Sequence, residues 1–182
     1  MFFKCIKQMS RKIDKNMEVF YVYKRNNDKE EVSFDKIIKR IKNLSKDLTI
    51  NSSILAQKII SGFYDGIKTS EVDEMAAQEC ASMCTMHPDY LTLASRIEIS
   101  NLQKNTSPSF SETINILYDN VDIHGNKCPL VSDSLYEIVK KNKTKLNSSI
   151  KYDRDEFIDY FGLKTLQKSY LMKVKGKIIE RP

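Results

Sequence analysis

The pattern of apolar and polar residues predicts a short hairpin at the start of the folded chain. Residues 19–24 are mostly aromatic or β-branched, a composition typical of a strand. The following Asn26-Asn27-Asp28 has the composition of a turn. Residues 30–32 then predict a returning strand. We therefore expect the first two elements to be antiparallel strands.

Four amphipathic helices are predicted after this hairpin. Ser33 is expected to be an N-cap, with Asp35 in the first turn, where the helix dipole favours an acid. The apolar residues that follow Ser33 recur at helical spacing: Phe34, Ile37, Ile38, Ile41 and Leu44. A second helix is predicted over 53–64, with Ile54, Leu55, Ile59 and Phe63 facing inward. Thr69 is expected to cap a third helix, and His87-Pro88-Asp89 ends it and starts a fourth.

The chain beyond residue 109 predicts a further helical segment. NTSPS at 105–109 is the clearest boundary signal. Helices are expected around 112–118, 132–141, 155–161 and 165–170, and a hairpin around Lys175-Gly176-Lys177. The fold class is therefore mainly α, of the α+β type: in 18–108 a small hairpin or three-stranded sheet caps a four-helix bundle, and 109–182 is a helical segment that ends in a hairpin. Residues 1–17 are expected to be a disordered basic extension.

Composition and charge narrow the classes of function. The chain is 41% hydrophobic and 30% charged, which suits a folded domain. Its net charge of +6 arises in residues 1–50, which hold 13 Lys and Arg against 7 Asp and Glu. This excess indicates either an anionic partner or a solvated lysine-rich surface. No apolar run approaches the ~20 residues of a membrane span, so no membrane partner is expected.

The four cysteines form no C-x-x-C pair, so a zinc ribbon is not indicated. Cys80, Cys84 and His87 have helical spacing and could be metal ligands, but buried cysteines on a helix face are the favoured interpretation. Free cysteines fit a reducing compartment, and the predicted location is the cytoplasm.

A phosphate site is predicted without any standard phosphate-binding loop. Neither G-x-x-x-x-G-K-[ST] nor G-x-G-x-x-G occurs, and no nucleophile, base and acid set is indicated. Lys24 and Arg25, however, leave the first predicted strand together, and Lys36 lies in the first turn of the next helix. These cations and the free N–H groups of the helix N-terminus would converge on one anion.

The stretch VYKRNNDKEEVSFDKI resembles the opening of the ATP-cone, the regulatory nucleotide-binding domain of ribonucleotide reductase large subunits. GFYDGIKTSEVDEMAA, HPDYLTLASRIEISNLQK, HGNKCPLV and the region from YDRDEF to the C-terminus resemble later segments of class I large subunits of eukaryotic and viral type, in the same order. The resemblance implies an allosteric site for ATP and dATP, with Glu30 toward the adenine, Lys36 and Lys104 toward phosphate, and Asp73 near the ribose. The implied nucleotide-binding residues are Val22, Tyr23, Lys24, Arg25, Glu30, Glu31, Val32, Ser33, Phe34, Asp35, Lys36, Thr69, Asp73 and Lys104.

The same resemblance implies the setting of this site. No cofactor is expected to be covalently bound, and ATP or dATP is expected to act as an effector together with Mg²⁺. The implied partners are the remainder of the large subunit, the small radical-generating subunit and other copies of the chain through the cone. None of the four cysteines matches a catalytic position of the family, so the chain is expected to be a fragment, a truncated product or a split subunit.

Two other functions remain open from the sequence. A free-standing ATP-cone sensor without catalysis would share the same site, although a DNA-binding sensor would need a reading element that the sequence does not show. A basic helical nucleic-acid binder would need an exposed recognition helix or stacking aromatics, and nucleic acid is not an expected partner.

Overall fold

The computed structural model describes residues 20–182, and the expected extension at 1–17 lies outside them. The predicted hairpin is confirmed, with a shorter first strand and a second strand shifted by one residue. β1 (Tyr21–Tyr23) pairs antiparallel with β2 (Lys29–Glu31), which sets Val22 opposite Glu30. Asn27 has a φ of 66° in the connecting turn, a conformation that asparagine tolerates better than most residues. A third strand, β3 (Ile67–Lys68), pairs parallel with β1, so the sheet order is β2-β1-β3.

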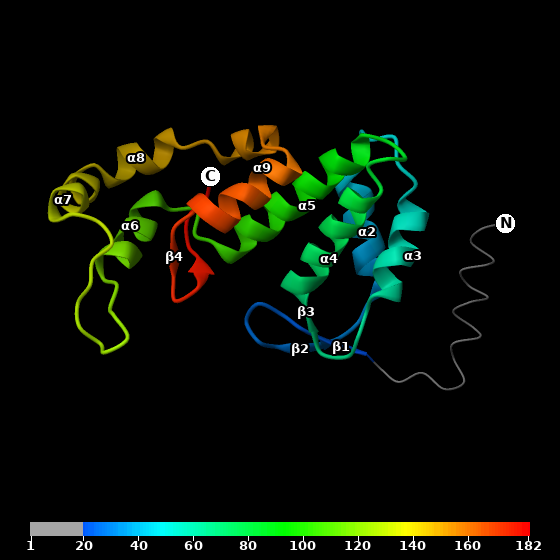
Figure 1. Cartoon of the computed structure of the whole chain (residues 1–182), viewed down its shortest axis with the longest axis horizontal. Helices are drawn as coiled ribbons and strands as arrows, with labels where there is room; N and C mark the ends of the chain where they lie inside the picture. Colours follow the sequence, from blue (N-terminus) through cyan, green and yellow to red (C-terminus); the bar gives the residue numbers. More distant parts are fainter. Residues whose placement is uncertain (1–19) are drawn as a thin grey trace.

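Four helices pack around one core, and the sheet lies across one end of them (Figure 1). They are α2 (Phe34–Leu44), α3 (Ser52–Ser61), α4 (Thr69–Ser82) and α5 (Asp89–Asn105). Their apolar faces form this core because the spacing of the apolar residues places them on one side of each helix. Leu55, Ile59, Ala77, Leu93 and Ala94 are among its fully buried members.

Two details of the predicted helices, at Ile54 and Thr69, were wrong, whereas the N-cap predicted at Ser33 was confirmed in its position. Ile54 does not face inward, since 39% of it is exposed. Ser33 occupies the N-cap position of α2, but its side chain makes no capping hydrogen bond. Thr69 is the first residue of α4 and not its cap: Lys68 holds the N-cap position, and its backbone N–H donates to the Glu71 carboxylate at 3.3 Å.

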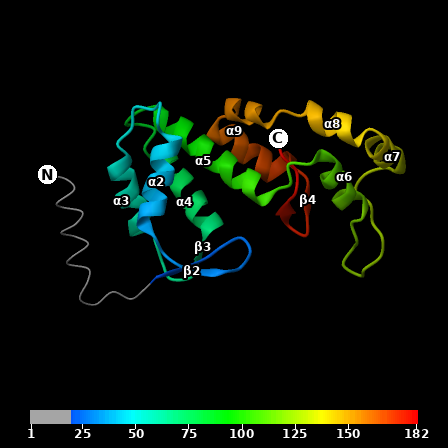
Figure 2. The same cartoon turned by 180° about the vertical axis from the view of Figure 1, so that it is seen from behind.

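The remainder of the chain forms a second helical segment that ends in a hairpin (Figure 2). Its elements are α6 (Phe110–Tyr118), α7 (Asp133–Lys141), α8 (Lys143–Ser149), η1 (Tyr152–Phe157), α9 (Tyr160–Thr165), η2 (Leu166–Tyr170), β4 (Lys173–Val174) and β5 (Lys177–Ile178). The helices expected at 112–118 and 132–141 and the terminal hairpin are confirmed. The stretch expected as a helix at 155–161 begins as a 3-10 turn, 165–170 is mostly a π turn, and α8 was not predicted.

Helix α5 joins the two parts of the chain because α9 packs against it. Tyr160 of α9 belongs to the core of the first four helices. On the same side, Leu163 is fully buried against Ile99 and Leu102 of α5. The mainly helical α+β fold class predicted from the sequence is therefore confirmed. No helix within residues 20–182 has the length and apolarity that a membrane crossing requires.

Candidate functional site

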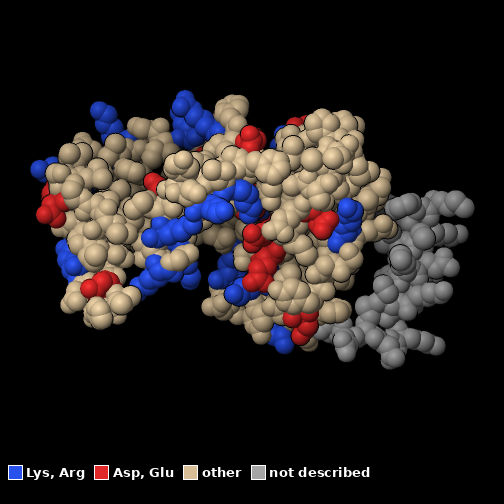
Figure 3. All heavy atoms as spheres, in the orientation of Figure 1, with Lys and Arg blue, Asp and Glu red and all other residues tan. Residues whose placement is uncertain are grey.

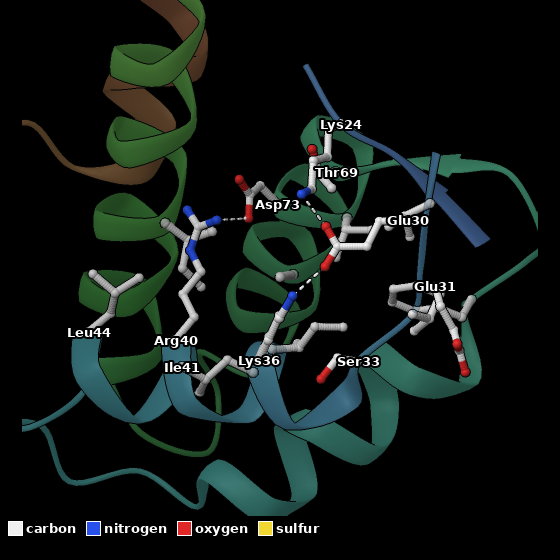
Figure 4. Close-up of a pocket in the computed structure, with 17 residues that line it drawn as sticks. Lys24, Glu30, Glu31, Ser33, Lys36, Arg40, Ile41, Leu44, Thr69 and Asp73 are labelled. Carbon is white, nitrogen blue, oxygen red and sulfur yellow. Dashed lines mark hydrogen bonds and ion pairs between the residues drawn. The ribbon is translucent and has the colours of Figure 1, made fainter. Parts of the chain in front are cut away.

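A cavity of about 260 Å³ lies between the sheet, α2 and α4 (Figure 4). Its floor is apolar because the inward faces of α2, α4 and α5 meet there. The apolar residues that line it are Val22, Val32, Ile37, Ile41, Leu44, Phe63, Val72, Ala76 and Ile97. The polar residues around it are Lys24, Glu30, Glu31, Ser33, Lys36, Arg40, Thr69 and Asp73. The arrangement is that of a ligand pocket, in which apolar contact area is combined with a few charged groups.

One group of charges is centred on Glu30. Lys24, just after β1, and Lys36, in the first turn of α2, both form ion pairs with its carboxylate (Figure 4). The hydrogen bond from Lys24, followed by that from Lys36, lowers the pKa of Glu30 to about 2. The Lys36 side chain is 71% exposed. Its ammonium group is therefore accessible to an anion that arrives from solvent.

A second group of charges is centred on Asp73, whose side chain is only 7% exposed. Its Oδ1 forms an ion pair with Arg40 Nη1 at 2.5 Å, and its Oδ2 accepts a hydrogen bond from Arg25 Nη2 at 3.0 Å. Lys104 Nζ lies 3.8 Å from Oδ2. Burial, which outweighs the opposing effect of Asp73, lowers the pKa of Lys104, and the neighbouring Arg40 and Arg25 lower it further. Three cations share one carboxylate here, and the excess positive charge favours binding of a further anion.

The structure brings most of the predicted site residues to this cavity. Val22, Lys24, Glu30, Glu31, Val32, Ser33, Lys36, Thr69 and Asp73 line it. Arg25 and Lys104 do not line it but reach Asp73. Tyr23 and Asp35 are exposed and lie outside the lining set, while Phe34 packs edge-on against Phe63 with ring centroids 5.5 Å apart. Lys24, Arg25 and Lys36 were expected to converge on one anion. Instead, Lys24 and Lys36 form ion pairs with Glu30, and Arg25 forms one with Asp73.

Sequence reasoning missed Arg40 and most of the apolar floor of the cavity. Arg40 follows Lys36 by one helical turn, so both side chains lie on one face of α2. That spacing was the available signal, but a cation on an amphipathic helix usually belongs to a solvated face. Val22 and Val32 were predicted as binding residues, but the other apolar residues of the cavity were not predicted to belong to a pocket.

Cys80, Cys84 and His87 do not form a metal site within residues 20–182. No group of three or more His, Cys, Asp and Glu side chains suited to a metal ion occurs within residues 20–182. Cys80 is fully buried in the core, and burial raises the pKa of its thiol to about 12. Of the two interpretations of Cys80, Cys84 and His87, burial on a helix face is therefore the supported one for Cys80.

Comparison with known proteins gives the family of this region. Residues 20–105 match the ATP cone domain. The chain is 49% identical over 166 residues to the ribonucleoside-diphosphate reductase large subunit of Arabidopsis thaliana, which covers 89% of the chain and 20% of that relative. It is 50% identical to large chain 2 of Saccharomyces cerevisiae and 48% identical to the large subunit of Monkeypox virus, again over 89% of the chain, with 19% and 22% of those relatives covered.

The chain thus spans about a fifth of the length of these curated relatives. The family match covers the sheet, helices α2–α5 and every residue that lines the cavity. Residues 20–105 are an ATP-cone domain, and the chain as a whole is similar to the N-terminal region of eukaryotic and viral ribonucleoside-diphosphate reductase large subunits.

Proposed function

We propose that the cavity binds ATP and dATP as allosteric effectors. The observation that carries this proposal is the combination of one apolar cavity with two groups of cations on its wall, within a region that matches the ATP cone domain. An adenine nucleotide has a matching division into an apolar base and an anionic triphosphate. Glu31, Ser33 and Thr69 supply further polar groups around the cavity.

The size of the cavity suggests how the nucleotide lies. At about 260 Å³ it is slightly smaller than the usual range of roughly 300–1,000 Å³ for ligand pockets. The base and the sugar would occupy it, and the phosphates would extend along its rim. Lys24, Lys36 and Lys104 would then bind phosphate oxygens, while Glu30 would accept a hydrogen bond from the adenine amino group. Binding exchanges the ion pairs of Glu30 for contacts with the ligand.

Asp73 is the residue proposed to respond to the ribose. ATP and dATP differ only at the 2′ position, so discrimination requires a polar group beside the sugar. Asp73 lines the cavity one helical turn after Thr69. Because its two oxygens are already paired with Arg25 and Arg40, a change at the sugar would also alter the contacts of these two cations.

Magnesium is proposed to arrive with the nucleotide. The phosphates of a triphosphate are themselves oxygen ligands for Mg²⁺, which usually keeps several waters and few protein ligands. Of the three carboxylates that line the cavity, Glu30 and Asp73 are already paired with cations. The protein's contribution to binding would therefore be cationic contact with the phosphates.

The wider role proposed for the chain follows its relatives. It would form the N-terminal, regulatory portion of a ribonucleoside-diphosphate reductase large subunit in the cytoplasm, controlling deoxyribonucleotide synthesis for DNA replication. The remainder of the large subunit, a small radical-generating subunit and further copies through the cone are the proposed partners. Exposed apolar side chains at Leu135, Ile138 and Phe161 suit packing against the remainder of a large subunit.

Calorimetry with matched variants tests the nucleotide site. Lys36→Ala and Lys104→Ala should weaken the binding of ATP and of dATP equally, by about 1.5–3 kcal/mol, because each variant loses a charged hydrogen bond to phosphate. Asp73→Asn should change the ratio of the two affinities more than their mean. Lys39→Ala is the matched control, since Lys39 is exposed on α2 and does not line the cavity. Affinities unchanged by Lys36→Ala and Lys104→Ala would contradict the proposal.

A further inference from the structure

Arg25 is held by three side chains from two helices. Its Nε donates to Asn105 Oδ1 at 2.7 Å. Its Nη2 donates to Asn101 Oδ1 at 2.6 Å and to Asp73 Oδ2 at 3.0 Å. A guanidinium group has five N–H donors, and the two on Nη1 have no acceptor within residues 20–182. The side chain is thus fixed with one edge left for another anion.

Asn101, like Asp73, is a buried member of this set, with 8% of the residue exposed. Its Nδ2 donates to the carbonyl oxygen of Ser70 at 3.2 Å, in the first turn of α4. The Asn105 amide also donates to Asn101 Oδ1, at 3.2 Å. One side chain on α5 therefore connects the start of α4 with the cation that follows β1. These are the elements that carry Thr69, Asp73 and Lys24 at the cavity.

We infer that Asn101 is a positioning residue for phosphate binding and acts through Arg25; this inference rests on the proposed nucleotide function. The residue does not line the cavity, so it would not touch the base or the sugar. Its effect would be to immobilise the guanidinium before the ligand arrives. Affinity gains when a binding group is already ordered, because less conformational freedom is lost on association.

The location of Arg25 explains why phosphate is the group affected. Arg25 reaches the cavity wall at Asp73, the carboxylate that Arg40 and Lys104 also contact. Phosphates that extend beyond the small cavity would meet this cluster. Without Asn101, Arg25 would keep its partners Asp73 and Asn105 but lose one of its two buried acceptors. The guanidinium would then sample other orientations.

A double-mutant cycle tests the inference. The probes are inorganic tripolyphosphate, ATP and adenosine, titrated by calorimetry into the full chain. Asn101→Ala should lower the affinity for tripolyphosphate and for ATP about tenfold, as expected for the loss of one well-placed charged contact. The affinity for adenosine should be unchanged. In an Arg25→Ala background Asn101→Ala should have no further effect, because residues that act as one unit are not additive. Asn115→Ala, exposed on α6, is the control.

Other results overturn the inference. If the role of Asn101 were purely structural, Asn101→Ala would weaken the binding of ATP and of adenosine alike. Its effect would then add to that of Arg25→Ala. If Asn101→Ala does not fold, Asn105→Ala tests the same relation to Arg25 at an exposed position. This variant should weaken the binding of tripolyphosphate by less than tenfold, and it should have no effect in the Arg25→Ala background. Wild-type chain that binds ATP but is insensitive to both asparagine variants refutes the inference alone. Wild-type chain that binds none of the probes refutes the proposed function.

Discussion

Lys164 of α9 and Glu98 of α5 form an ion pair at 2.8 Å, with only 4% of the Glu98 side chain exposed. Lys164 Nζ also lies 3.3 Å from Glu74 of α4. The second oxygen of Glu98 is buried and makes no hydrogen bond within residues 20–182. One lysine of the second segment is therefore the partner that compensates a buried carboxylate of the ATP cone.

Removal of this lysine should destabilise the chain. Removing one partner of a fully buried ion pair lowers the free energy of unfolding by about 3–5 kcal/mol. Because the Lys164 side chain is 28% exposed, we expect Lys164→Ala to lower it by about 2 kcal/mol. Urea unfolding measures the loss. Lys168→Ala is the control, since this lysine is exposed and one helical turn away. If the two variants are equally stable, the ion pair does not contribute as described.

The charges around Glu30 predict a dependence of stability on pH. The pKa of Glu30 is about 2 in the folded chain, against an ordinary value of 4.5, because Lys24 and Lys36 favour its charged form. A carboxylate whose pKa is lower in the folded chain stabilises the fold at pH values above its pKa in the unfolded chain. This stabilisation is lost as the pH falls through its pKa in the folded chain. The difference in melting temperature between wild type and Glu30→Gln should therefore shrink from pH 5 toward pH 2.

Glu31→Gln provides the comparison for this measurement, because Glu31 is an exposed neighbour on the same strand. Its melting temperature relative to wild type should not follow the trend seen for Glu30→Gln. If the wild-type advantage over Glu30→Gln stays constant down to pH 2, the ion pairs with Lys24 and Lys36 do not set the titration of Glu30.

Hydrogen exchange should divide the chain into regions of different stability. Helices α4 and α5 pack closely together within the main core, so their amides should exchange most slowly. The segment α6–α8 has a separate, smaller core formed by Ile114, Leu117 and Val139, and its amides should exchange faster. Leu117 is 2% exposed in this smaller core, whereas Ile138 is 56% exposed. Uniform protection across 34–104 and 110–149 would contradict this division.

Helical elements with strong apolar periodicity were predictable from the sequence. The spacing of Ile37, Ile41 and Leu44 indicated α2 because one helix face must be buried. Helix α8 escaped prediction because its sequence, KTKLNSS, carries a single apolar residue, and none of its residues is buried. Strand β3 has two residues and depends on its parallel pairing with β1. Such a strand has no local signal.

The site was partly predictable for a similar reason. Lys24 and Lys36 are close in sequence and carried a local signal at the hairpin and the helix start. Their shared contact with Glu30 needs only this local structure. Arg40 and Asn101 depend on contacts between distant segments, since Arg40 reaches Asp73 and Asn101 reaches Arg25. Periodicity does not show which polar residues meet across helices.

Blue lysine and arginine side chains also gather over the second segment on the face shown in Figure 3. In the sequence of this segment, Lys168, Lys173, Lys175 and Lys177 are exposed and form no ion pair within the part of the chain that the structure describes. Nonspecific attraction of nucleotides to this surface would be steeply weakened by salt. Binding in the cavity should retain a contribution from the apolar floor at high salt.

Chemical-shift mapping of the ¹⁵N-labelled chain with ATP tests the central claim most directly, because it reports where a nucleotide binds. We predict saturable shifts at the cavity, around Val22, Glu30–Lys36, Thr69 and Asp73, that persist at high salt, with α6–α8 unaffected. No shifts at millimolar ATP, or shifts confined to the lysines of 168–177, would contradict the assignment of the cavity as the nucleotide site.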